Sequence, residues 1–390
     1  MSERRIALSD LTYDAAEEQA VLDVLRSKWL SSGPQVQAFE AEFAARVGAA
    51  SALAVSSATA ALHLALAGLD IGPGDEVIQP AINFVAAANM TVATGATPVF
   101  ADISALDEPV IDPTAIERLI TPRTKAVVVM YYGGYFGRTP EIVDLCRQRG
   151  LLLIEDACHA VGARCTALDD RPAGGIGDVA CFSFFSNKNL ATGEGGMVTT
   201  SRPDLAERLR LLRSHGMTTM TWQRDRGHAS SYDVLVHGYN YRLDEIRAAL
   251  GRVQLGKLDA NNARRRAAVD HYRRRLAGLT GWTVPFANST GDSACHLMVV
   301  VAPDALARAA AAAALKAAGV QTSLHYPSVP TFQAFERFAH ADLPLSDQYG
   351  RLTLTLPLHP GLSADDLDYV CDVLQEAAAA RPAKVPGGTP

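Results

Sequence analysis

The sequence lacks the features that mark membrane, secreted and repeat proteins. It holds no apolar run of about 18 residues, and its start does not combine basic residues with an apolar stretch. Its 6 cysteines form no C-x-x-C pair and are too sparse for a disulfide scaffold. No repeat of about 20–50 residues is present either. We therefore expect a cytoplasmic protein with no membrane span, no secretory signal and mostly buried cysteines.

An excess of positive charge is also missing. The chain has 36 Lys and Arg against 42 Asp and Glu, a formal net charge of −6. Nucleic acid attracts proteins through a surplus of Lys and Arg, so a nucleic-acid partner is not expected. The most basic segment, Arg252–Arg275, is interpreted as the solvated face of a helix. A role near an anionic nucleotide or at a subunit interface is the alternative.

Short apolar runs alternate with helical stretches between Leu53 and Thr200, which is typical of parallel strands joined by crossover helices. One apolar run, Ala126–Met130, is followed by a helix that we expect Thr139 to cap. The next run, Leu151–Ile154, shows no polar alternation, which predicts a strand covered on both faces. Glu155 and Asp156 follow at its carboxyl end, where α/β sheets bind ligands.

The fold class predicted from this pattern is α/β, with a sheet of six or seven strands. The other expected strands are Leu53–Ser56, Glu76–Ile78, Pro98–Ala101 and Val179–Phe182. Beyond about Leu250 the pattern changes to long helices, a strand at Leu297–Val301 and a helix that begins at Pro303. We therefore predict a large domain over residues 1–250 and a smaller α+β domain over residues 251–390. A long loop is expected at His215–Tyr232, with no role assigned to His228.

Small hydroxyl residues follow two of the predicted strands. The segment Ser56–His63 places them before an Ala/Leu-rich helix, where free backbone N–H groups and the positive helix end suit a phosphate. An ordinary helix cap is the alternative reading of this segment alone. The second segment, Ser183–Lys188, adds a further hydroxyl and a lysine. Together the two segments favour a cofactor site.

Lys188 lies among small and apolar neighbours, close to the glycine-rich run Gly193–Gly196. Desolvation makes a lysine amine more nucleophilic, although most lysines are surface charges. Asp156, on an earlier strand, can hold the ring nitrogen of a pyridine. A lysine for an imine, an aspartate for a pyridinium nitrogen and hydroxyls for a phosphate are what pyridoxal 5'-phosphate requires.

A longer series of motifs resembles the sugar aminotransferases of the DegT/StrS group, which are pyridoxal phosphate enzymes of fold type I. The motifs run in order from Trp29 to Tyr326. They are Trp29–Pro34, Ser56–His63, Gly74–Ile78, Gly95–Phe100, Glu155–Asp156, Ser183–Lys188, Gly193–Gly196 and Gly238–Arg242. The resemblance implies a three-layer fold: a large, mostly parallel seven-stranded sheet domain with an N-terminal arm, and a smaller C-terminal α+β domain.

The resemblance also implies roles for individual residues. Lys188 would form the Schiff base and move the proton, and Asp156 would keep the ring nitrogen protonated. His159 would contact the cofactor, with a buried core histidine as the alternative. The other implied cofactor contacts are Phe84 on the ring, Ala58, Thr59 and Ser183 on the phosphate, and Asn240 and Arg242 from a partner subunit. A homodimer with shared active sites follows from the last two. Trp29, Ser31, Tyr132, His325 and Tyr326 are expected near the substrate, and no metal is expected.

Two positions depart from the pattern of the family. Met130 and Pro330 stand where many members have histidine. Neither position belongs to the transamination machinery, so the departures concern the substrate pocket.

The function implied is a transaminase that moves an amino group from glutamate or glutamine to a ketone of a nucleotide-linked deoxysugar, as in deoxysugar or antibiotic biosynthesis. A free keto-cyclitol (an inosose) is the alternative substrate. A sugar dehydratase is disfavoured, because such relatives replace the lysine by histidine. A non-catalytic regulator is disfavoured because Lys188, Asp156 and Ser183 are all present.

Overall fold

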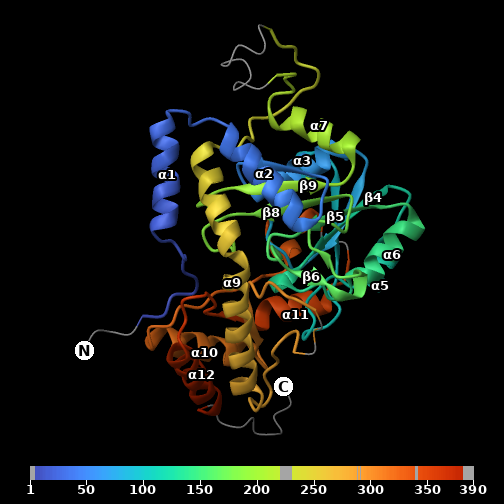
Figure 1. Ribbon diagram of the computed structural model, residues 1–390. Coiled ribbons are helices and arrows are strands. Elements are labelled where there is room, and N and C mark those ends of the chain that lie inside the picture. Colours follow the sequence, from blue (N-terminus) through green and yellow to red (C-terminus); the bar gives the residue numbers. More distant parts are fainter. Residues whose placement is uncertain (1–4, 220–230, 288, 290, 339–340, 381–390) are drawn as a thin grey trace.

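The computed structural model describes residues 5–219, 231–287, 289, 291–338 and 341–380, and a seven-stranded sheet forms its centre (Figure 1). Most of the predicted loop at His215–Tyr232, including His228, lies outside the described residues. The strands, in spatial order, are β1 (Ser51–Val55), β9 (Gly196–Thr200), β8 (Val179–Ser183), β5 (Leu152–Asp156), β4 (Thr124–Met130), β2 (Glu76–Pro80) and β3 (Thr97–Ala101). Only β9 runs antiparallel to its neighbours, so the expected mostly parallel sheet of seven strands is confirmed.

Two helical layers cover the sheet because its strands send apolar side chains to both faces. Along β4, Val127 and Val129 enter one core, whereas Ala126 and Val128 enter the other. The first core is closed by α2 (Pro34–Val47), α5 (Pro113–Leu119), α6 (Thr139–Arg149) and part of α9 (Glu245–Leu276). The second is closed by α3 (Ala58–Gly68), α4 (Ala86–Ala93) and α7 (Pro203–Arg213). This arrangement is the three-layer architecture expected from the sequence.

Two helix starts differ from the prediction. Thr139 is the first residue of α6 and does not cap it; its hydroxyl instead donates to the Phe136 carbonyl oxygen at 2.5 Å. The helix predicted from Pro303 is α10 (Ala305–Ala317), and Asp304 caps it by accepting from the backbone N–H of Ala307. An aspartate that reaches the third backbone N–H is a better cap than the proline before it.

The C-terminal region is built around the long helix α9, which runs from beside α2 to α12 (Figure 1). Its other elements are β10 (Met298–Val301), α11 (Pro344–Leu352), β11 (Thr353–Leu356) and α12 (Ala364–Ala379), with α10 packed on α12. β10 and β11 pair antiparallel over a separate apolar core. The helix α9 passes through residue 250, and the division of the chain at that residue stays a prediction.

The remaining elements are short or lie at the edge of the molecule. They are α1 (Ala15–Ser27), which packs on α9, the small pair β6 (Arg164–Cys165) and β7 (Arg171–Pro172), and the single-turn helices Tyr132–Gly134, Thr166–Leu168, Val329–Thr331 and Glu336–Phe338.

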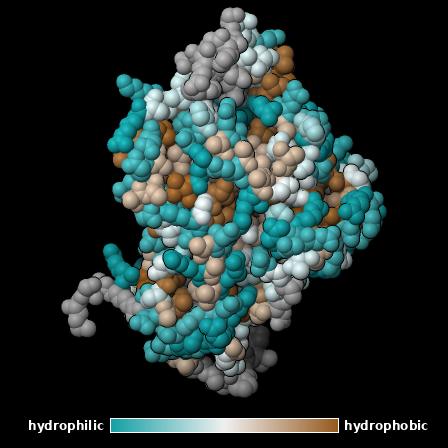
Figure 2. All heavy atoms as spheres, in the orientation of Figure 1, coloured by the Kyte–Doolittle hydropathy of each residue, from teal (hydrophilic) through white to brown (hydrophobic). Residues whose placement is uncertain are grey.

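The surface is mixed, and one basic residue of α9 is not on it. Figure 2 shows hydrophobic residues in separate patches among hydrophilic ones on this face. No helix within the described residues is long and apolar enough to cross a bilayer. Within the basic segment, Arg265 is only 3% exposed and is an exception to the predicted solvated helix face, because the other basic residues of the segment are half-buried or exposed. Its Nη1 donates to the Leu358 carbonyl oxygen at 2.9 Å, which offsets part of the cost of burying the guanidinium.

Candidate active site

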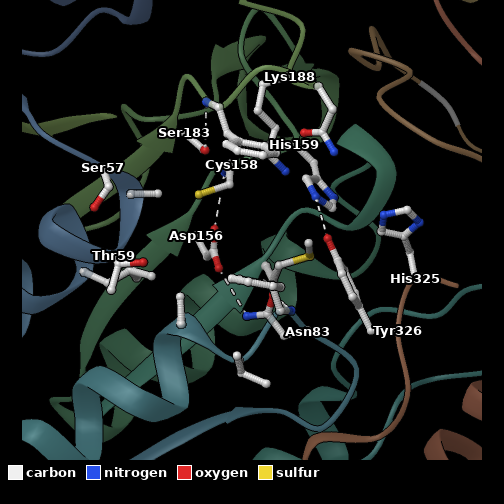
Figure 3. Close-up of a pocket in the computed structure, with 18 of the residues that line it drawn as sticks. Ser57, Thr59, Asn83, Asp156, Cys158, His159, Ser183, Lys188, His325 and Tyr326 are labelled. Carbon is white, nitrogen blue, oxygen red and sulfur yellow. Dashed lines mark hydrogen bonds between the residues drawn. The ribbon is translucent and has the colours of Figure 1, made fainter. Parts of the chain in front are cut away.

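A cavity of about 700 Å³ opens where β4, β5 and β8 end (Figure 3). The strand register brings Met130 beside Asp156, and Ser183 ends the neighbouring strand, so the carboxyl edge of the sheet forms its floor. Nine predicted site residues line this cavity: Ala58, Thr59, Phe84, Asp156, His159, Ser183, Lys188, His325 and Tyr326. The structure therefore gathers side chains that lie up to 268 positions apart in the sequence.

The amino end of α3 points its backbone N–H groups at this cavity. Ser57 caps the helix, with its Oγ accepting from the backbone N–H of Ala60 at 3.1 Å, so the ordinary cap is confirmed. Ser57 and Thr59 also line the cavity opposite Ser183. Backbone N–H groups without intrahelical partners and two nearby hydroxyls form a site that suits a phosphate.

The glycine-rich run after Lys188 brings this helix end close to the sheet. A Cβ on Gly196 would lie 2.6 Å from the carbonyl carbon of Ser57 and 2.7 Å from the Phe182 oxygen. Only glycine therefore allows the backbone of β9 to pass between β8 and the start of α3.

Asp156 is buried at the end of β5, and both of its carboxylate oxygens are held. Asn83 Nδ2 donates to Oδ2 at 3.1 Å, and the backbone N–H of Cys158 donates to Oδ1 at 3.3 Å (Figure 3). The backbone N–H of Phe84 in turn donates to Asn83 Oδ1 at 2.6 Å. These contacts fix the direction of the carboxylate, which faces the middle of the cavity.

Lys188 enters the cavity from the loop that joins β8 to β9. The loop is closed by hydrogen bonds from the Phe184 N–H to the Gly195 oxygen and from the Lys188 N–H to the Phe185 oxygen, at 2.9 and 2.8 Å. Desolvation lowers the pKa of the Lys188 amine, while the nearby Cys158 and Asp156 oppose that shift. A desolvated amine with a lowered pKa carries the lone pair that attack on an aldehyde needs.

A histidine and a tyrosine close the cavity on the side of the C-terminal region. Tyr326 Oη and His159 Nε2 are 3.0 Å apart, and the backbone N–H of Gly133 donates to His159 Nδ1 at 3.4 Å (Figure 3). Burial, followed by the Lys188 and His325 charges, holds the pKa of His159 well below its usual range. Burial and Lys188 also lower the pKa of His325 to about 4. Both imidazoles are therefore neutral at pH 7.

Five predicted residues lie outside the cavity formed by this chain. Tyr132 is buried behind it, where its hydroxyl donates to the His325 carbonyl oxygen. Trp29 is half-buried and Ser31 is exposed, both in the segment before α2. Asn240 is exposed, whereas Arg242 is half-buried and donates to Ser214 Oγ at 3.0 Å. Of the two departures, Met130 lines the cavity, whereas Pro330 is packed in a buried single-turn helix beside it.

Sequence reasoning missed other residues of this site. Asn83, Phe185 and Phe332 line the cavity, and His296 lies behind Lys188. Asn83 sits one position before the aromatic residue Phe84, and that proximity is the one sequence signal that points to it. His296 belongs to the C-terminal region and has no such signal.

The donor set fits pyridoxal phosphate. The helix end suits its phosphate, the held carboxylate of Asp156 suits a protonated ring nitrogen, and the amine of Lys188 suits its aldehyde. No group of three metal-ligating side chains occurs within the described part of the chain. The fold and these residues together define a pyridoxal-phosphate-dependent enzyme of fold type I.

Comparisons with known proteins give the family. Residues 12–375 match the model of the DegT/DnrJ/EryC1/StrS aminotransferase family, and the chain belongs to that family. The spore coat polysaccharide biosynthesis protein SpsC of Bacillus subtilis is 43% identical over 370 residues, which cover 92% of this chain and 94% of SpsC. The chain is thus a sugar aminotransferase of this family.

Two solved structures agree closely with the fold. DesV of S. venezuelae, in complex with a ketimine intermediate, is 37% identical with a TM-score of 0.86, and 95% of each chain is covered. DesI, in the presence of its TDP-sugar product, is 31% identical with a TM-score of 0.85, covering 96% of this chain and 92% of DesI. Fold class and enzyme class are therefore confirmed.

Proposed function

We propose that this protein transfers an amino group from glutamate or glutamine to the keto group of a nucleotide-linked sugar, with pyridoxal phosphate bound through Lys188. The observation that carries the proposal is the joint placement of Lys188, Asp156 and the amino end of α3 around one cavity. Bound pyridoxal phosphate supplies an electron sink for the bonds at the amine-bearing carbon. The TDP-sugar product of the relative DesI supports the substrate class.

The residues of the chain have distinct tasks in this proposal. Lys188 forms the Schiff base and then moves the proton between the two carbon positions, because its desolvated amine has a lowered pKa and reaches into the cavity. Asp156 keeps the ring nitrogen protonated, held in direction by Asn83. Ala58, Thr59 and Ser183 bind the phosphate, Phe84 packs on the ring, and His159 contacts the cofactor from the side of Tyr326.

A homodimer completes the site in this proposal. Among the described residues that line the cavity, Lys188 is the one Lys or Arg. A nucleotide-linked sugar brings further phosphates, whose negative charge calls for more cationic side chains than this chain places there. Phe84, Phe185 and Phe332 line it with 57, 46 and 37% of their surfaces exposed. A second copy that covers these rings and brings Asn240 and Arg242 would bury the apolar surface and add the missing positive charge.

The test is the visible absorbance of the purified protein together with its transamination rate. Wild type is expected to bind pyridoxal phosphate with the absorbance of a Schiff base, which borohydride fixes on Lys188. The variant Lys188→Ala is expected to lose that absorbance and at least 10³-fold in rate, on the order of the loss when a covalent catalyst is removed. A Lys188→Ala variant that transaminates as well as wild type would refute the proposal.

The substrate class is tested with a panel of keto compounds. The proposal predicts turnover of a nucleotide-linked ketosugar and little turnover of the free inososes. Turnover of an inosose alone would instead assign the protein to free cyclitols. Formation of a deoxygenated sugar without amine transfer would assign it to the dehydratases, and cofactor binding without any spectral change on addition of glutamate and glutamine would indicate a regulator.

A further inference from the structure

His296 lies directly behind Lys188, although it belongs to the C-terminal region. It precedes β10, is 5% exposed, and its Nε2 lies 3.5 Å from the Lys188 Nζ. Its backbone N–H donates to the Gly133 carbonyl oxygen at 2.8 Å, which anchors it to the turn after β4. The imidazole packs on that of His159, with ring centroids 4.3 Å apart. A side chain from the second part of the fold is thereby placed against the reactive amine.

A chain of amide hydrogen bonds determines which nitrogen of His296 carries the proton. Asn262 Nδ2 donates to the Val161 oxygen at 3.0 Å, so Asn262 Oδ1 is the acceptor for Asn189 Nδ2 at 2.8 Å. Asn189 Nδ2 also donates to the Ala294 oxygen at 2.7 Å. Asn189 Oδ1, 2.9 Å from His296 Nδ1, is therefore an acceptor, and Nδ1 must be the protonated nitrogen. The lone pair of Nε2 is left facing Lys188.

The surroundings of His296 keep its ring neutral. Burial is the main cause that holds the pKa of His296 well below its usual range, and His159, Lys188, Arg265 and His325 add to it in that order. Arg265 Nη1 lies 3.5 Å from the His296 carbonyl oxygen, and within the described residues this buried guanidinium pairs with no carboxylate. An uncompensated cation at that place opposes a second positive charge on the imidazole. His296 therefore acts as an acceptor at neutral pH.

We propose that His296 is a positioning residue for Lys188: its neutral Nε2 accepts a hydrogen bond from the lysine amine and holds that amine at the mouth of the cofactor cavity. The proposal rests on the proposed role of Lys188 as the cofactor-binding amine. One N–H of the amine is committed to His296, which leaves its lone pair free toward the cavity. Asn189 and Asn262 fix the imidazole, so the direction of the amine is set before cofactor or substrate binds.

Two substitutions separate this role from simple packing. Asparagine at position 296 carries an amide N–H where Nδ1–H lies and can keep the bond to Asn189, but it does not reach Lys188. Glutamine extends one carbon further and places an amide oxygen near the position of Nε2. Both variants are neutral, and a purely packing role predicts a change in the free energy of unfolding, larger for the shorter asparagine, without a shift in the pKa of Lys188. The proposed hydrogen bond predicts instead that the pKa of Lys188 changes in His296→Asn and that glutamine restores the acceptor.

The experiment is the titration of Lys188 in the full-length chain after removal of the cofactor. Trace acetylation by acetic anhydride is measured at Lys188 by mass spectrometry across pH values, against a free amine standard. The ammonium form loses its acceptor in His296→Asn, so the pKa of Lys188 is expected to fall by about one unit, the size of a hydrogen bond to a charged group. His296→Gln is expected to stay close to wild type. His271→Asn, which alters a histidine bonded to Asp368, is the control.

Equal pKa values of Lys188 in wild type and His296→Asn would overturn the proposal, and so would equal shifts in His296→Asn and His296→Gln. Nitrogen NMR of ¹⁵N-histidine-labelled wild type needs no variant and is expected to show His296 protonated at Nδ1 and bare at Nε2. An Nε2–H tautomer or an imidazolium at pH 7 would likewise overturn it. Failure of the proposed function would look different: added pyridoxal phosphate would then form no Schiff base on wild-type Lys188.

Discussion

Acid sensitivity above pH 5 is expected from the histidines around the cavity. His159, His296 and His325 are neutral in the folded chain because burial lowers the pKa of each, in the case of His325 from 6.5 to about 4. In the unfolded chain all three titrate near 6.5. The unfolded chain therefore binds more protons below pH 6.5, and the free energy of unfolding falls as the pH drops.

The size of the effect follows from the two pKa values. The pKa of His325 is near 6.5 in the unfolded chain and about 4 in the folded chain. At pH 5 this difference lowers the free energy of unfolding by about 2 kcal/mol. Burial holds the pKa of His159 and of His296 well below its usual range as well, so both histidines add to this loss in the same direction. The contribution of His325 alone, about 2 kcal/mol, is a sizeable share of the roughly 5–15 kcal/mol typical of a folded domain. Above pH 7.5 the effect disappears.

Urea unfolding at pH 7.5, 6.5, 5.5 and 5.0 measures the effect, at one protein concentration and without added cofactor. The variant His325→Gln removes one titrating group and is expected to lose about 2 kcal/mol of the pH dependence between pH 7.5 and 5.0, whatever its stability at pH 7.5. The control His237→Gln changes an exposed histidine and keeps the full dependence. A stability that is flat between pH 7.5 and 5.0, or a slope unchanged in His325→Gln, would contradict the neutral cluster.

Two further predictions concern the scaffold of the site. The Glu155 carboxylate accepts hydrogen bonds from the Tyr131 hydroxyl and from three backbone N–H groups, those of Gly174, Ile176 and Gly177. Glu155→Leu leaves these buried backbone donors without a partner and is expected to lower the free energy of unfolding in urea by at least about 3 kcal/mol, with a smaller loss in Glu155→Gln. A loss under about 1 kcal/mol in Glu155→Leu would contradict this. Gly196→Ala forces β9 away from Ser57, so it is expected to lower the free energy of unfolding by about 1–3 kcal/mol and to weaken pyridoxal phosphate binding in an absorbance titration. The control Gly256→Ala, which has open space around it on α9, is expected to change neither quantity. Equal behaviour of the two variants would contradict the close approach of β9 to Ser57.

The two departures from the pattern of the family, Met130 and Pro330, differ in their position relative to the cavity. Met130 lines the cavity beside Asp156, so the pocket has an apolar wall where many members present an imidazole. Pro330 lies outside the lining and packs with the buried Val329. Of the two, Met130 is the one placed to influence the choice of ketone.

The sequence by itself determined the class of fold and the chemistry of the cofactor site. The apolar runs at Ala126–Met130 and Leu151–Ile154 required strands buried on both faces, because no polar residue interrupts them. Asp156 and Ser183 could be found because they follow such runs and parallel strands end at one edge of a sheet, and Lys188 because it lies five positions after Ser183, before a glycine-rich run. Local sequence pattern predicted helix starts less well: α10 is capped by Asp304, whereas the predicted helix began at Pro303.

Only the tertiary structure decided how these groups are held and which ones work through others. Asn83 and Asp156 are 73 positions apart in the sequence, and His296 and Lys188 are 108 positions apart, so neither hydrogen-bonded pair can be recognised without the folded structure. The burial of Arg265, the exception on an otherwise solvated basic helix face, likewise became visible only in the structure. Hydrogen bonds and charge effects depend on distance and on exclusion of water, and neither quantity is carried by local sequence pattern. The candidate site residues could therefore be identified from the sequence, whereas the tautomers, the neutral states and the directions of their side chains were set by packing.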